Sequence, residues 1–173
     1  MRRYLAVILI CTFLIGSSAL AAVRGHKSMY AAGTLTNLTK GQMGRLQTSE
    51  SALVFSPDKG TAVTIPYTAI TGMDYGEHAG RRIGSTIALG VTTLGVMALP
   101  MLLSKKKRHY LTVYFNNDPK VATEERDRLA KDPKAVAKGD VAAFEINKHD
   151  YADLISVLQA KTGVAVQEEE SKR

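Results

Sequence analysis

Imidazole, carboxylate and thiol groups supply most metal ligands, nucleophiles and proton carriers in enzymes, so their spacing is the first test for chemistry. The four histidines lack the four-residue spacing that places two imidazoles on one helix face: His26, His78, His109 and His149. This pattern predicts no metal site and no cofactor.

Asp74, Glu77 and His78 form a dense group of ionisable side chains and include the residue types of general acid–base catalysis. The group directly precedes Arg81 at the start of a long apolar segment, so a polar connector is the favoured interpretation. The only cysteine, Cys11, lies in an apolar N-terminal run, so the rest of the chain has no thiol nucleophile. We therefore expect a protein that is not an enzyme.

The N-terminus has the three-part order of a secretory signal. Two arginines after Met1 precede an apolar run from Tyr4 to Ile15, and Ala19-Leu20-Ala21 supplies the small residues of a cleavage site. We predict a signal peptide over residues 1–21 and export to the cell envelope, most simply to the inner membrane or periplasm of a bacterium. The run is nearly long enough to span a bilayer, which leaves an uncleaved anchor open.

A second apolar segment, Ile83 to Leu103, has 21 residues and no charge. A helix of that length would reach roughly 31 Å, the thickness of the hydrocarbon core of a bilayer. The segment therefore predicts a transmembrane helix, with a buried core helix or an oligomer interface as alternatives. A re-entrant helical hairpin, turning near Thr92 to Gly95, would keep both ends at one surface.

Positive charge is concentrated at the two borders of this segment. The formal net charge is +7, and six cations flank the segment: Arg81, Arg82, Lys105, Lys106, Lys107 and Arg108. A nucleic-acid-binding protein would spread its cations over a broad face, so we expect no nucleic-acid partner. We expect the six side chains to lie at anionic lipid headgroups, where each charge contributes about 1 kcal/mol. The lipid bilayer is the predicted partner.

Small residues within the segment support a second interpretation. Gly84, Ala88, Thr92 and Gly95 fall along one helical face, and such strips allow two membrane helices to approach closely. Contact of this face with a second copy of the chain, or with another membrane protein, would make the chain a structural subunit of a membrane complex.

Outside this segment the sequence indicates short strands separated by turn residues. We expect strands at 44–48 and 52–56, and then at 61–65, 69–75, 110–115 and 141–146. Residues 23–32 resemble a loose lead-in, and residues 123–131 a short polar helix capped by Thr123. The charged tail from Gln167 onward is expected to fray.

The last element is the best defined. An apolar residue recurs every three or four positions over about 148–161, which predicts a helix with one buried face: Tyr151, Leu154, Ile155 and Leu158. Asn147 can cap the start of this helix and Gly163 can close its end.

Several short strands followed by one C-terminal helix resemble the layout of bacterial pleckstrin-homology-like or GRAM-like domains. The resemblance rests on the runs Ala52–Phe55, Val63–Ile70 and Tyr110–Phe115 and on the helix ending Lys161-Thr162-Gly163. It implies an α+β, mainly β fold: a small antiparallel sandwich or partly open barrel capped by the C-terminal helix, with an apolar helix or helical hairpin inserted between strands. It also implies binding rather than catalysis.

The expected organisation is a signal peptide at 1–21, a lead-in at 22–43, one domain at 44–163 interrupted by segment 83–103, and a charged tail at 164–173. We expect a non-enzymatic, membrane-associated envelope protein that acts as a binding or scaffolding module. The alternative is the structural subunit that assembles through the small-residue face.

Overall fold

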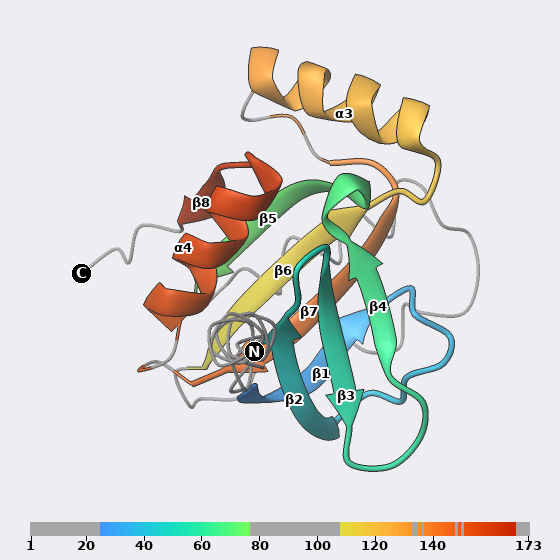
Figure 1. Cartoon of the computed structure of the whole chain (residues 1–173), viewed down its shortest axis with the longest axis vertical. Helices are drawn as coiled ribbons and strands as arrows, with labels where there is room; N and C mark the ends of the chain where they lie inside the picture. Colours follow the sequence, from blue (N-terminus) through green and yellow to red (C-terminus); the bar gives the residue numbers. More distant parts are fainter. Residues whose placement is uncertain are drawn as a thin grey trace, which may run out of the picture.

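The computed structural model describes residues 25–76, 108–132, 135, 137–147, 149 and 151–168. Within these ranges an eight-stranded sheet curls into a half-barrel, accompanied by two α-helices and one short 3-10 helix (Figure 1). The mainly β, α+β class expected from the sequence is confirmed. The predicted leader at 1–21 and the apolar segment at 83–103 lie outside the described residues.

The first half of the sheet is an antiparallel meander. Its strands are β1 (His26–Gly33), β2 (Gln42–Thr48), β3 (Ala52–Pro57) and β4 (Val63–Pro66). β2 and β3 contain the predicted strands at 44–48 and 52–56 and pair antiparallel around Ser49-Glu50-Ser51. A 3-10 helix, η1 (Tyr67–Ala69), follows β4 and leads into the second half of the sheet.

The second half begins with β5 (Ile70–Gly76), which pairs antiparallel with β6 (His109–Phe115). β7 (Asp140–Ile146) pairs with β6 on one side and with β1 on the other, and so joins the two halves. A short strand, β8 (Val166–Glu168), runs parallel to β5 at the sheet edge. The resulting order is β4-β3-β2-β1-β7-β6-β5-β8.

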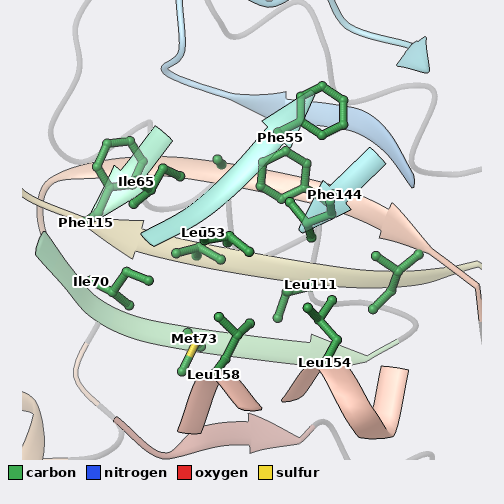
Figure 2. Close-up of a cluster of buried hydrophobic side chains, with 14 of the residues drawn as sticks. Leu53, Phe55, Ile65, Ile70, Met73, Leu111, Phe115, Phe144, Leu154 and Leu158 are labelled. Carbon is green, nitrogen blue, oxygen red and sulfur yellow. The ribbon is translucent and has the colours of Figure 1, made fainter. Parts of the chain in front are cut away.

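The main hydrophobic core lies on the inner face of the curled sheet, with α4 (Tyr151–Thr162) against it (Figure 2). Alternate residues of the strands supply it because successive strand side chains point to opposite faces. Each side chain of this kind contributes roughly 1.5–3 kcal/mol when it leaves water. The largest ones include Leu46, Leu53, Phe55, Ile70, Met73, Leu111 and Phe144.

The C-terminal helix has the predicted buried face. Leu154, Ile155 and Leu158 of α4 are buried, and Figure 2 shows Leu154 and Leu158 pointing towards β5 and β6. Gly163 follows the helix with a φ of 68°, a conformation that favours glycine, and its N–H donates to the Gln159 carbonyl oxygen over 2.9 Å. The prediction from the spacing of apolar residues is therefore confirmed.

The other helix, α3 (Pro119–Lys131), begins four residues earlier than predicted. The side chain of Asp118 accepts a hydrogen bond from the Lys120 N–H over 2.9 Å, so Asp118 is the N-cap and Thr123 is not. The Thr123 hydroxyl instead donates to the Pro119 carbonyl oxygen over 2.8 Å. An acidic cap followed by proline is a strong start signal, because proline needs no N–H at the first helical position.

Two segments expected to be irregular contribute strands. Residues 23–32, expected to be a loose lead-in, include most of β1, which lies between β2 and β7. Its alternation is weak because apolar and polar residues occur on both faces around a bulge between Tyr30 and Ala32. The tail expected to fray from Gln167 onward overlaps β8, which forms by pairing with β5.

The expectation of a transmembrane helix requires correction. Among the described residues, α3 has 13 residues and α4 has 12, and no helix there is long and apolar enough to cross a membrane.

Candidate functional site

The candidate site is the end of the β5–β6 pair at which residues 77–107 connect the two strands. The register runs from Ile70 opposite Phe115 to Gly76 opposite Tyr110, so β5 ends beside the start of β6. The chain therefore leaves the sheet after Gly76 and re-enters it after Arg108 at the same end of the β5–β6 pair.

Arg108 is the one predicted headgroup contact that the structure describes. Its Nη1 lies 2.6 Å from Glu145 Oε2 of β7, and the two side chains are 36% and 26% exposed. The hydrogen bond from Arg108 and the charge of Glu145 raise the pKa of the guanidinium, so Arg108 stays positive. Half-exposed ion pairs of this kind contribute little to stability, and part of the arginine charge remains available to solvent.

The other predicted site residues lie outside the described part of the chain. They are the basic residues Arg81, Arg82, Lys105, Lys106 and Lys107 and the small residues Gly84, Ala88, Thr92 and Gly95.

Aromatic rings tie this end of the sheet to α4. The Tyr75 ring stacks on Tyr151 of α4, with centroids 4.3 Å apart and planes 8° apart, and on His109 at 5.7 Å and 14°. Tyr75 Oη lies 3.1 Å from His109 Nδ1. Sequence reasoning did not associate these three residues, because they meet only when β5, β6 and α4 pack together. The stack therefore joins the ends of β5 and β6 to the start of α4.

Asp74 lies within β5, as the predicted strand 69–75 requires, and on the outer face of the sheet rather than in a polar connector. It is 8% exposed, and its Oδ2 accepts a hydrogen bond from Tyr114 Oη over 3.1 Å. Thr112 lies opposite Asp74 on β6 and is fully buried. The Asp74 carboxylate therefore helps to hold β5 against β6 through Tyr114. It takes no part in the Tyr75–His109 ring contact.

The described histidines are not gathered into a site. His26 begins β1, His109 begins β6, and His149 lies in the turn before α4. Within residues 25–76 and 108–168, as far as the structure describes them, no group of three or more His, Cys, Asp or Glu side chains could hold a metal ion.

Comparison with known proteins gives likenesses to solved structures and no sequence match. No family model matches the chain, and no curated protein matches it. Among solved structures, it is similar to a chain in the structure of the Spt16D Pob3N heterodimer, with a TM-score of 0.44 and 12% sequence identity. The match covers 87% of this chain and spans 60% of the length of that chain. At this level of identity and overlap, function has to be argued from the residues themselves.

Proposed function

We propose that the chain is a non-enzymatic binding or scaffolding module of the cell envelope, held against an anionic membrane surface by basic residues at one end of its sheet. The observation that supports this proposal is the pairing of Gly76 with Tyr110. The chain leaves β5 and enters β6 at one end of the sheet, and the two basic borders follow and precede these points by a few residues in the sequence. The predicted secretory leader supports the envelope location.

Chain geometry limits how far these cations can lie from this end of the sheet. Arg81 and Arg82 follow Gly76 by five and six residues, and an extended chain advances at most about 3.6 Å per residue, which gives roughly 18–22 Å. Lys105 to Lys107 precede Arg108 by three residues or fewer, a reach of roughly 11 Å. The six cations can therefore meet one membrane surface together, where each contributes about 1 kcal/mol before screening.

The proposed fold family is pleckstrin-homology-like. Seven antiparallel strands, followed by α4 against the inner core, support this assignment. The parallel edge strand β8 and the long connection between β5 and β6 are additions to that layout. The proposed fold family implies a binding role rather than catalysis, and the fold alone does not identify the surface that binds.

The test compares recovery of the full-length chain on two kinds of vesicle in a flotation assay. One vesicle contains equal amounts of phosphatidylglycerol and phosphatidylcholine, and the other contains phosphatidylcholine alone. The ratio of the two partition coefficients isolates the electrostatic part of binding, because apolar insertion contributes to both. Glutamine at all six basic positions should lower this ratio by about a hundredfold or more, and added salt should lower the wild-type ratio.

A matched pair of double variants provides the control. Arg81→Gln/Arg82→Gln and Lys120→Gln/Lys131→Gln remove the same charge, but Lys120 and Lys131 lie on α3 beyond the opposite end of β6. The first pair should lower the ratio and the second should leave it within about twofold. Equal effects from the two pairs would show a dependence on net charge alone and would overturn the proposal.

A further inference from the structure

Two cations face each other on the outer surface of the sheet. Lys27 of β1 lies directly opposite Arg45 of β2, and both residues are exposed. Neither forms an ion pair with a described residue. Like charges directly opposite on paired strands weaken the pairing, so this arrangement calls for an anion that the sheet itself does not supply.

The strand register extends this pair towards the β5–β6 connection. Ile146 of β7 pairs with both Ser28 and His109. Continued by one residue, the same register places Asn147 between Lys27 and Arg108. Arg45 of β2 and Lys27 of β1 thus lie in a row that continues past the end of β7 to Arg108, directly before β6. Three strand spacings separate Arg45 from Arg108, or roughly 14 Å. Glu145, in the neighbouring row, is already engaged by Arg108.

The next row on the same face of the sheet, formed by Met43, Met29 and Glu145, also presents apolar side chains. Met43 lies opposite Met29, and Met43 is 51% exposed, the largest exposed fraction among the described large hydrophobic residues. A flexible thioether side chain adapts readily to an irregular apolar environment. Cations beside exposed apolar side chains are the combination found on surfaces that lie in the headgroup region of a bilayer.

We propose that this basic and apolar strip, formed by Lys27, Met29, Met43, Arg45 and Arg108, lies against the same anionic bilayer as the borders of residues 77–107. The cations would contact lipid phosphates while Met43 enters the interface. This inference rests on the proposed function and extends it from the β5–β6 connection to the folded sheet. Arg108 belongs to both surfaces, so one bilayer plane can meet them together.

The first test uses the same vesicle ratio and the full-length chain. Lys27→Gln/Arg45→Gln should lower the ratio by roughly 25-fold, since each cation at an anionic surface contributes about a factor of five. Lys120→Gln/Lys131→Gln is the matched control and should change the ratio by less than about twofold. Both double variants replace exposed side chains, so folding should be retained in each.

The second test reports on position. In a Cys11→Ser background, Met43→Cys and Val121→Cys each carry one environment-sensitive dye. The two sites are comparably exposed, at 51% and 43%, but Val121 lies on α3. Anionic vesicles should shift the emission of the dye at position 43 to the blue and leave the dye at position 121 unchanged.

The outcomes separate this inference from the proposed function. If Arg81→Gln/Arg82→Gln lowers the ratio while Lys27→Gln/Arg45→Gln behaves like the α3 control, the strip is not a bilayer contact and the proposed function stands. If the wild-type chain shows no preference for anionic vesicles, both proposals fail. An equal dye response at positions 43 and 121 would also overturn the proposal that the strip contacts the bilayer.

Discussion

Arg126 should hold α3 onto the sheet. Its Nε donates to the Ile70 carbonyl oxygen over 2.7 Å, and its Nη2 donates to the carbonyl oxygens of Tyr67 and Thr68, each over 2.8 Å. These carbonyls lie at η1 and at the start of β5, where a short helix ends without enough backbone N–H partners. One guanidinium therefore joins three elements, and Arg126→Ala should release α3.

The free energy that these hydrogen bonds contribute to the docking of α3 depends on how exposed each bond is. The bond to Thr68 is exposed, so water can replace it, whereas the bonds to Ile70 and Tyr67 are partly buried. A hydrogen bond with a charged partner contributes about 1.5–3 kcal/mol, and partial exposure favours the lower value. Two such bonds give about 3 kcal/mol, or roughly a hundredfold increase in the opening of α3.

Hydrogen exchange of the full-length chain measures this opening directly. Protection of the α3 amides should fall by roughly a hundredfold in Arg126→Ala and by less in Arg126→Lys, because one ammonium cannot match the fork of a guanidinium. Lys120→Ala, an exposed change on the same helix, should stay within about 0.5 kcal/mol of wild type. If α3 exchanges equally in Arg126→Ala and Lys120→Ala, the three contacts do not hold the helix.

Two further predictions concern stability. Gly44→Ala should lower the urea midpoint of unfolding, because the added Cβ would lie 2.5 Å from the Ser56 carbonyl oxygen. Gly72→Ala should be tolerated, because the nearest atom to its Cβ, on the Tyr114 ring, would be 3.5 Å away. Equal midpoints for the two variants would refute the steric argument. Hydrogen bonding from Arg128 is the main cause that lowers the pKa of Glu125. This stabilisation is present above the pKa of the carboxyl in the unfolded chain and is lost as the pH falls through its pKa in the folded chain. In Glu125→Gln the free energy of unfolding should therefore depend less steeply on pH in that range. An unchanged pH dependence would contradict this prediction.

Local pattern was sufficient for several elements of the fold. The run from Tyr110 to Phe115 is rich in aromatic and β-branched residues and forms β6. The spacing of Leu154, Ile155 and Leu158 predicted the buried face of α4. These signals are readable because strand and helix periodicities place neighbouring residues on defined faces without reference to distant parts of the chain.

Other elements depend on distant partners. β1 has little strand pattern of its own and is defined by pairing with β2 and β7 on either side. β8 is three residues long and exists as a partner of β5, whose register joins Met73 to Val166. A strand this short gains its hydrogen bonds from the neighbouring strand, so composition alone cannot identify it.

The order of residues by itself determined the mainly β class, the C-terminal helix and the two basic borders of an apolar segment, because each depends on composition or on spacing along the chain. Tertiary structure decided where these features meet. The pairing of Gly76 with Tyr110, and of Lys27 with Arg45, follows from register between strands, and register depends on how every inner-face side chain packs into the core. That packing is a property of the whole sheet, so the basic and apolar strip became visible only in the folded chain.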